Sequence, residues 1–279
     1  MLAVEAVQRA LRAFGASAAT CAYATGAEGS PGSSLCAALV IFLFYSVAIR
    51  LLYYGVGALM QRAAEELASN CGTGRTPTEL RRLHRAESEA AFFLYPSVAF
   101  LSEWFQLKGL SRTCMTISEC GGPAQALLNT VVWFFVFELG VFLVHWGVLH
   151  KLEWGKRAFK HSRHHAAKRS TEMTVWTGFA FEAIDGTLQG LPLPLAQLLV
   201  PVPYQFVTCL GLVLGLWTMY IHIGIPHLPW PLMGADYHFL HHKFNSGNYG
   251  MFTVLWDTVF GTIKYPTPEN MQNTPNKAQ

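Results

Sequence analysis

The sequence predicts an all-α, polytopic integral membrane protein with about four to five transmembrane helices and a histidine-rich site for two metal ions on the cytosolic side. Three observations support this prediction. Of the 279 residues, 52% are hydrophobic and 13% are charged, whereas soluble globular chains carry about 25% charged residues. Several apolar runs are long enough to cross a bilayer. Ten of the 11 histidines fall between His145 and His242.

Composition and cysteine spacing exclude several other classes of protein. The net charge is +3 and no basic stripe is interleaved with aromatic residues, so no nucleic-acid partner is expected. The six cysteines include no CxxC pair, which argues against a zinc ribbon or a thioredoxin-type site. Cys114 and Cys120 could form a disulfide if their loop faces an oxidising lumen, and are otherwise free thiols.

The N-terminal part of the chain contains one clear spanning segment and one short one. Residues 1–35 are expected to be flexible or to form an amphipathic helix. Residues 36–60 form the first spanning helix, with 25 residues and a single charge, Arg50. Residues 90–102 are uncharged but number only 13, whereas a span needs about 20. They form either a re-entrant segment or a tilted helix that continues through Glu103.

The C-terminal part contains a strong span and a long uncharged run. Residues 121–149 are interrupted only by Glu138 and place His145 and His150 near their C-terminal end. Residues 186–221 hold 36 residues without a charge, which at about 1.5 Å per residue is nearly two bilayer crossings. Prolines break this run, so we expect a helical hairpin; they are Pro192, Pro194, Pro201 and Pro203.

Basic residues predict the orientation in the membrane. Residues 61–90 contain five Lys or Arg and residues 151–169 contain seven, whereas residues 103–123 contain two. The positive-inside tendency places the first two segments in the cytosol. This arrangement requires the region 90–107 to cross the membrane.

The histidines form three boxes, with two further histidines between the second and the third. The boxes are HWGVLH at 145–150, HSRHH at 161–165 and HFLHH at 238–242, and the pair is His222 and His227. On an α-helix the three histidines of HxxHH share one face, so we expect each such box to converge on one point. All ten are candidate ligands, and imidazole suits iron, zinc, copper or nickel; they are His145, His150, His161, His164, His165, His222, His227, His238, His241 and His242.

The first box is a looser fit to a helix. Five residues turn through about 500°, which leaves its two rings about 140° apart on an α-helix. We therefore expect the helix to end between His145 and His150, or each ring to bind a different metal. His84 lies outside the cluster and is expected to be a surface or structural residue. Because the boxes on both sides of 186–221 must meet, this run has to leave one membrane face and return to it.

At these boxes the chain resembles the fatty acid hydroxylase/sterol desaturase superfamily, whose pattern is HX3–4H, HX2–3HH and HX2–3HH. The resemblance covers residues 124–265, the expected catalytic domain, which follows a transmembrane region at 36–123 and precedes a tail at 266–279. Further motifs are similar to the sterol C-5 desaturases (lathosterol oxidases): FAFEAIDGTLQ at 179–189, Trp217 followed by Ile221 and His222, MGADYH at 233–238, and NYGMFTVLWDTVFGT at 248–262. The HX4H spacing of the first box is that of fatty acyl hydroxylases in the superfamily, and Glu182-Ala183 stands where C-5 desaturases have His-Pro.

The resemblance implies an enzyme that uses two iron ions, with zinc able to replace iron, and O2 to oxidise an unactivated C–H bond of a lipid. The implied reaction is the introduction of the C-5 double bond into a sterol, in the endoplasmic reticulum membrane. The sequence shows neither a heme-attachment CxxCH nor a GxGxxG loop after a strand. Electrons are therefore expected from separate proteins, which the resemblance implies are cytochrome b5 and NADH-cytochrome b5 reductase.

Other residues are assigned supporting roles. Ligating imidazoles usually donate their second N–H to a carboxylate or carbonyl, and the candidates are Asp185, Asp236, Asp257, Glu138 and Asn248. Four aromatic residues are candidates for the substrate pocket, or alternatively for an interfacial belt: Trp146, Trp176, Trp217 and Tyr237. Part of the basic segment 151–169 could receive an acidic electron donor, with Lys156, Arg157 and Lys160 as the candidate residues.

Two other functions stay open at this point. A relative of the same superfamily could hydroxylate or oxidise a fatty acyl, sphingoid or 4-methyl sterol substrate. A metal transporter or metal-binding scaffold would carry out no oxidation. Transporters place ionisable ligands near the middle of the bilayer, whereas these histidines flank a basic loop.

Overall fold

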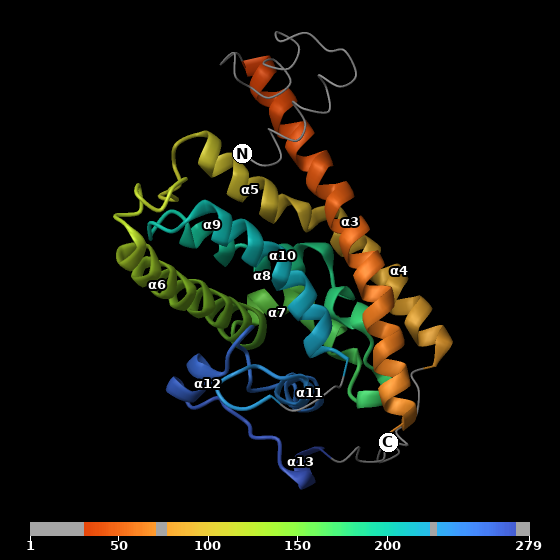
Figure 1. Cartoon of the computed structure of the whole chain (residues 1–279). Coiled ribbons are helices and arrows are strands. Elements are labelled where there is room, and N and C mark those ends of the chain that lie inside the picture. The colour runs from red at the N-terminus through yellow and green to blue at the C-terminus, as the bar shows by residue number, and fades with distance from the viewer. Residues whose placement is uncertain (1–30, 71–76, 224–227, 272–279) are drawn as a thin grey trace.

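The computed structural model describes residues 31–70, 77–223 and 228–271 of the chain (Figure 1). No β-strand forms in these ranges, which contain two isolated bridges, so the all-α prediction is confirmed. The α-helices are α3 (Pro31–Asn70), α4 (Thr78–Leu94), α5 (Pro96–Leu107), α6 (Pro123–Phe142), α7 (Glu153–Phe159), α8 (Ala183–Gly190), α9 (Pro192–Ala196), α10 (Tyr204–Ile221), α11 (Ala235–Phe244), α12 (Leu255–Val259) and α13 (Pro268–Met271).

Shorter helical turns lie in the histidine-rich middle of the chain. They are the π-helix η1 (Leu143–Lys151) and the 3-10 helices η2 (His161–Ala166), η3 (Ser170–Glu172) and η4 (Val175–Phe179). The segment expected at 1–35 lies mostly outside the described residues. Its end, from Pro31 onward, already belongs to α3, because proline is favoured in the first turn of a helix.

Within the part of the chain that the structure describes, three helices are long and apolar enough to cross a membrane: Ala38–Leu67, Pro123–Lys151 and Tyr204–Ile221. Large apolar side chains such as Leu43 and Leu51 on α3 and Leu127 on α6 are exposed, as expected for surfaces that face lipid. The total of four to five spans stays a prediction.

The short uncharged segment 90–102 is divided between α4 and α5. The chain remains helical at Tyr95 and restarts a helix at Pro96, which cannot donate a backbone hydrogen bond. α5 continues through Glu103 to Leu107 and packs against α3 and α9. Of the two alternatives, the structure has the helix that continues through Glu103, divided at Pro96; that this segment crosses the membrane stays a prediction.

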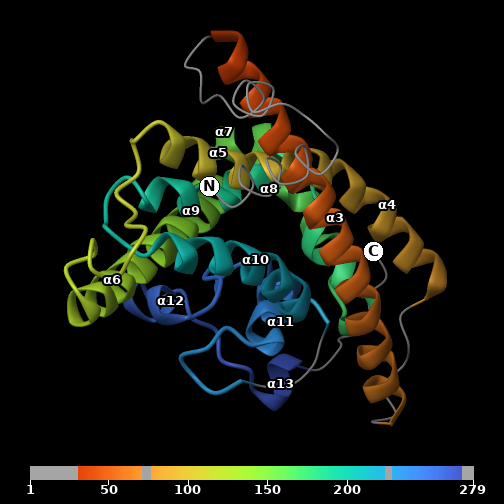
Figure 2. The ribbon, with the colours of Figure 1, turned by 45° about the horizontal axis from the view of Figure 1, so that its top comes forward.

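The uncharged run 186–221 forms the two limbs of a hairpin. α8 and α9 make the outgoing limb, which is broken at Leu191 before Pro192, and α10 makes the return limb. Figure 2 shows α10 between α6 and α3. The tip of the hairpin binds the loop after α5, because Arg112 N donates to Gln197 O at 2.8 Å and Tyr204 N donates to Cys114 O at 3.0 Å.

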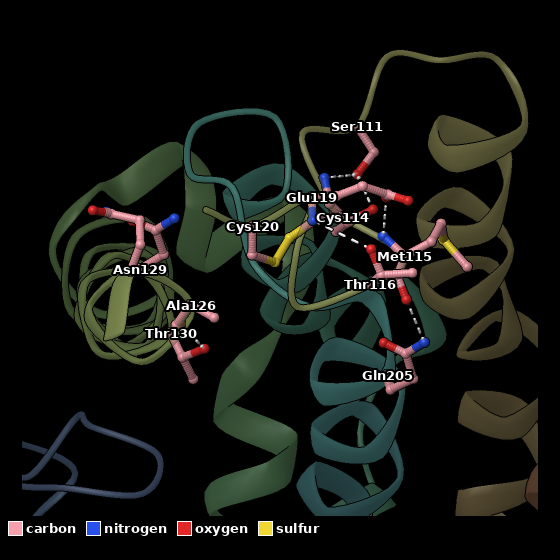
Figure 3. Close-up of a disulfide and its surroundings, with 12 residues drawn as sticks. Ser111, Cys114, Met115, Thr116, Glu119, Cys120, Ala126, Asn129, Thr130 and Gln205 are labelled. Carbon is pink, nitrogen blue, oxygen red and sulfur yellow. Dashed lines mark hydrogen bonds between the residues drawn. A yellow bond between two sulfur atoms is a disulfide. The ribbon is translucent and has the colours of Figure 1, made fainter. Parts of the chain in front are cut away.

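The same loop contains a disulfide between Cys114 and Cys120 (Figure 3). Of the two states left open by the sequence, the structure has the paired one. Gln205 of α10 donates to the carbonyl of Met115 at 2.9 Å, so the disulfide loop is also attached to the return limb. This loop and α11–α13 lie toward opposite ends of the structure (Figure 1).

Two aromatic clusters hold the helices together. One joins α3, α4 and η4 through Tyr53, Phe92 and Phe179, whose ring centroids lie 4.9–5.8 Å apart. The other joins α6 to α10 through Trp133 and Phe206, with ring centroids 5.8 Å apart. The clusters fix the ends of α6 and α10 and the turn η4, which together surround the histidines.

Candidate metal centre

The structure gathers nine of the ten clustered histidines into two groups, within each of which all candidate ligand nitrogens lie within 4.8 Å of one another. His227 lies outside the described residues. The first group comprises His145, His150, His161, His165 and His241. The second group comprises His164, His222, His238 and His242.

Each HxxHH box is shared between the two groups, so the expectation that one box converges on one point is wrong. In α11, His238 and His242 belong to the second group and His241 to the first. On an α-helix adjacent residues point about 100° apart, whereas residues four apart differ by about 40°. The first and last histidines of the box, His238 and His242, therefore point into the same group. The middle histidine, His241, points toward the neighbouring group.

The box at 161–165 shows the same division with the groups exchanged. His161 and His165 join the first group and His164 joins the second. This segment is the 3-10 helix η2. The two boxes thus face each other, and each contributes two histidines to its own group and one to the other.

The first box depends on a π-helix. The helix does not end between His145 and His150, as the sequence suggested, but continues through both as η1. Hydrogen bonding from i to i+5 stacks residues five apart on the same face. Both rings therefore enter the first group instead of diverging, and their centroids lie 5.1 Å apart.

Backbone carbonyls and one carboxylate orient the rings. Six histidines use Nδ1 toward an oxygen outside the groups: His145 to Tyr249 O, His150 to Asn245 O, His161 to Asp185 Oδ2, His222 to Thr218 O, His241 to Gly247 O and His242 to Ala167 O. A neutral imidazole has one N–H, so donation from Nδ1 leaves Nε2 as a bare acceptor. In this tautomer each of the six rings presents a lone pair to its group.

Close nitrogen pairs indicate that a cation belongs between the rings. The Nε2 atoms of His145 and His161 are 3.1 Å apart, and those of His222 and His242 are 3.2 Å apart. In both pairs the two Nδ1 atoms already donate elsewhere, so no proton is available to bridge them. The buried Nε2 of His241 has no hydrogen-bond partner among the described residues. The donor set therefore fits metal ions that prefer nitrogen ligands.

Burial keeps these rings neutral. Desolvation, and then the neighbouring imidazoles, lower the pKa well below its ordinary value of 6.5 for His164, His165, His238, His241 and His242. Burial lowers the pKa of His222 to about 4, although its hydrogen bond to Thr218 O opposes the shift. The neutral form is the one that binds a metal ion.

Of the five residues expected to orient the ligands, Asp185 contacts a histidine directly. Its side chain is fully buried on α8, and Oδ2 lies 2.7 Å from His161 Nδ1. Asp236 lies in the first turn of α11, where Oδ1 accepts the backbone N–H of Tyr237 at 2.9 Å.

The other three residues do not contact a histidine directly but hold the loop whose carbonyls orient His145 and His241. They are Glu138, Asp257 and Asn248. Glu138 accepts the N–H groups of Phe252 and Thr253 at 3.0 and 2.9 Å. Asp257 accepts those of Tyr249 and Gly250 at 2.8 and 2.9 Å. The amide of Asn248 donates to Tyr237 O and Lys264 O at 2.9 and 3.0 Å. The loop carbonyls that face His145 and His241 are thereby fixed.

A cavity of about 40 Å³ adjoins both groups of histidines. Its lining includes His145, His164, His222 and His238. The remaining side chains are mostly apolar and come from α8, α10, η4 and nearby loops: among them are Tyr95, Phe179, Phe181, Gln189, Leu214, Thr218, Ile221 and Met251.

The four aromatic residues proposed for the substrate pocket are not among the residues that line this cavity. Trp146 packs on Phe142, Trp176 packs on Tyr54, Trp217 donates to the carbonyl of Met251, and Tyr237 packs near Tyr265. They lie in the helix-packing layers around the site. Of the residues that do line it, Gln189 ends the FAFEAIDGTLQ motif at 179–189, whereas no pattern distinguishes Leu214 in the sequence.

The remaining candidates lie at the edge of the site. Lys156, Arg157 and Lys160 are exposed on α7 and its C-terminal cap, directly after η1. Lys156 forms an exposed ion pair with Glu153 at 2.7 Å. His84 is buried and its Nδ1 lies 3.0 Å from Thr177 Oγ1, so it is the structural residue of the two alternatives.

Comparisons with known proteins agree with the motifs. Residues 130–262 match the model of the family described as fatty acid hydroxylase. The chain is 32% identical over 178 residues to a Delta(7)-sterol-C5(6)-desaturase of Nicotiana tabacum, covering 63% of this chain and 64% of the relative. It is 35% identical over 149 residues to a putative Delta(7)-sterol-C5(6)-desaturase 2 of Arabidopsis thaliana, covering 49% and 52%. It is 30% identical over 167 residues to a lathosterol oxidase of Homo sapiens, covering 58% and 54%.

The matched region therefore spans about half to two thirds of the length of these relatives. No solved structure matches the chain significantly.

The two groups predict separable metal losses. His241→Ala removes a nitrogen from the first group and His164→Ala removes one from the second. We expect each variant to lose metal from one group and retain it in the other, so that bound metal falls to about half of the wild-type content. Metal analysis of purified protein measures this, with His84→Asn as the matched control. Full metal content in both variants would show that these histidines do not hold a metal.

Acid should destabilise the metal-free protein. The pKa of His222 is about 4 in the folded state against 6.5 for the free side chain. Between these values the unfolded chain binds more protons than the folded chain, so the free energy of unfolding falls as the pH falls. We expect the unfolding temperature of metal-free protein to drop between about pH 7 and about pH 5. The unfolding temperature of metal-loaded protein should fall less over the same pH range. If the unfolding temperature of the metal-free protein does not change, the buried rings are not held neutral as described.

Proposed function

Because residues 130–262 match the model of the fatty acid hydroxylase family, we propose that this chain is a membrane-bound oxidoreductase that uses two iron ions and O2 to oxidise a lipid. The reaction proposed is introduction of the 5(6) double bond into a Δ7-sterol. The names of the relatives support this substrate: they include Delta(7)-sterol-C5(6)-desaturases and lathosterol oxidases.

The observation that carries the proposal is the pair of adjoining histidine groups, of five and four rings, at the wall of one mostly apolar cavity. Neutral nitrogen ligands suit iron. Iron held by these rings would supply the activation of O2 and the transfer of electrons that oxidation of an unactivated C–H bond requires. Asp185 is the carboxylate that contacts a ring directly, so the ligand set adds little negative charge.

The protein's own contribution is to orient ligands, place the substrate and exclude water. Carbonyls from Gly247, Tyr249 and Thr218 fix the ring planes. The cavity is lined by His145 from the first group and by His164, His222 and His238 from the second. A C–H bond held there faces both groups, while apolar side chains keep bulk water away.

Electrons are proposed to come from cytochrome b5 and its NADH-dependent reductase at the cytosolic face of the endoplasmic reticulum. The exposed cations Lys156, Arg157 and Lys160 support this, because they lie on the segment that directly follows His150. Complementary charge mainly speeds the encounter of an acidic donor with such a patch.

Two features bear on the alternatives. The HX4H spacing of the first box supports hydroxylation or oxidation of a fatty acyl, sphingoid or 4-methyl sterol substrate as the second candidate. Transport is disfavoured, because His145 and His150 lie near the C-terminal end of the span Pro123–Lys151 and His222 directly follows the span Tyr204–Ile221. Transporter ligands instead lie near the bilayer midplane.

Complementation tests the proposed reaction. Expression in a yeast strain that lacks its own sterol C-5 desaturase should restore 5,7-diene sterols, read by mass spectrometry. The His164→Ala variant, expressed to the same level, should restore none because the second histidine group is incomplete. Hydroxylated lipids without diene sterols would select the second candidate instead.

Charge reversal tests the donor surface. Changing Lys156, Arg157 and Lys160 to Glu should slow turnover driven by cytochrome b5 about tenfold at low salt, because electrostatic steering is lost. The deficit should shrink near 0.15 M salt, where the Debye length is about 8 Å. Metal content should not change, and reversal of the exposed Arg62 and Arg82 provides the control. Equal rates for wild type and the triple variant at low salt would remove the docking role.

A further inference from the structure

The space beside the histidines is too small for a whole lipid. Its volume of about 40 Å³ holds a few water-sized groups. A second cavity of about 250 Å³ lies between α3, α5, α9 and α10. Tyr95 and Leu214 line both cavities, so the two adjoin at these side chains. A lipid with a carbon at the histidines can extend past this pair into the second cavity.

The second cavity offers surroundings for hydrocarbon. Its walls include Phe44, Ile49, Val98 and Leu193. The hydroxyls in its wall are already engaged: Thr208 Oγ1 donates to Tyr204 O at 3.1 Å, and Ser102 Oγ accepts from Gln197. Burial of apolar surface stabilises a lipid here by about 25 cal/mol per Å².

Besides the histidines, the polar side chains that line the first cavity are those of Tyr95, Gln189 and Thr218. Thr218 Oγ1 donates to Leu214 O at 2.9 Å, and the hydroxyls of Tyr95 and Tyr53 are hydrogen-bonded to each other. Gln189 Nε2 donates to Asp185 Oδ1 at 3.0 Å, which sets the orientation of the amide. In the described part of the chain Gln189 Oε1 has no hydrogen-bond partner, and the residue lines the cavity. A partly buried carbonyl oxygen of this kind favours a donor from the ligand.

We propose that the substrate binds with a hydroxyl donated to Gln189 Oε1 and with its hydrocarbon end past Tyr95 and Leu214 in the cavity between α3, α5, α9 and α10. This inference rests on the proposed function and specifies its substrate class as a hydroxysterol bound hydroxyl-first. In a Δ7-sterol the hydroxyl-bearing carbon lies in the same or the adjacent ring as the carbons of the 5(6) bond. The hydroxyl and the reacting bond therefore both fit the cavity at the histidines, and the alkyl side chain points away.

Gln189→Leu tests recognition of the hydroxyl. The change keeps the approximate volume of the side chain and removes the acceptor. With metal-loaded protein in nanodiscs, we expect binding of radiolabelled lathosterol to weaken about tenfold, the effect of one lost hydrogen bond. Binding of its 3-O-methyl ether, which cannot donate, should not weaken. Because Gln189 also bonds Asp185, which orients His161, the metal content of the variant shows whether the substitution disturbs the histidine groups. Gln125→Leu, at an exposed position, is the matched control.

Gly211→Phe tests the position of the hydrocarbon end independently. Gly211 lines the second cavity, and a Cβ added there would meet Leu193 Cδ2 at 3.7 Å, an ordinary contact. The phenyl ring should therefore enter the cavity. We expect it to weaken binding of lathosterol about tenfold and to leave binding of an analogue without the alkyl side chain unchanged.

The outcomes separate the two proposals. If wild-type protein does not bind lathosterol, the proposed sterol function is wrong and the inference falls with it. If wild type binds lathosterol, either of two results would show that the binding orientation is wrong while the sterol function stands. The first is that Gln189→Leu still binds lathosterol more tightly than its 3-O-methyl ether. The second is that Gly211→Phe changes the binding of lathosterol and of the analogue without the alkyl side chain to the same extent.

Discussion

Nine imidazoles, eight of them buried, are turned toward two points and repel one another unless each ring is held in one tautomer with a cation between the lone pairs. For six rings the structure meets the first condition, because their Nδ1 atoms have an oxygen partner, as for His145 with Tyr249 O and His161 with Asp185. Desolvation keeps the rings uncharged, because it lowers the pKa of imidazoles such as that of His241. A metal ion bound in each group would then replace proton bonding as the interaction that holds the rings together.

The need for fixed acceptors explains the buried acids around the site. Glu138 projects from the spanning helix α6 and binds the backbone at Phe252 and Thr253. Asp257 binds the same loop two residues earlier, at Gly250. A loop with its N–H groups satisfied in this way cannot rotate its carbonyls freely, so these carboxylates position histidines without touching them.

The helical hairpin connects the two histidine groups to the apolar cavity. On its outgoing limb, Asp185 and Gln189 lie on the same face of α8. The hydrogen bond between them links the carboxylate that orients His161 to the cavity wall. Its return limb ends at His222, a member of the second group. At the far end the disulfide loop binds the hairpin tip through Tyr204 N and Cys114 O. The limbs are thus fixed at both ends, with the apolar cavity between them and α3 and α5.

The sequence by itself determined the all-α class, the long apolar helices, the proline-broken hairpin and the set of histidines, because hydrophobic runs, prolines and box spacing are local patterns. The tertiary structure decided how the rings divide into two groups, since that depends on a π-helix at His145 and on boxes meeting from distant segments. It also decided which residues line the cavity at the histidines: Gln189 lines it, whereas Trp176 does not. The physical reason is that ring orientation here depends mainly on backbone carbonyls such as that of Tyr249, 104 positions from His145, and every residue type carries the same carbonyl.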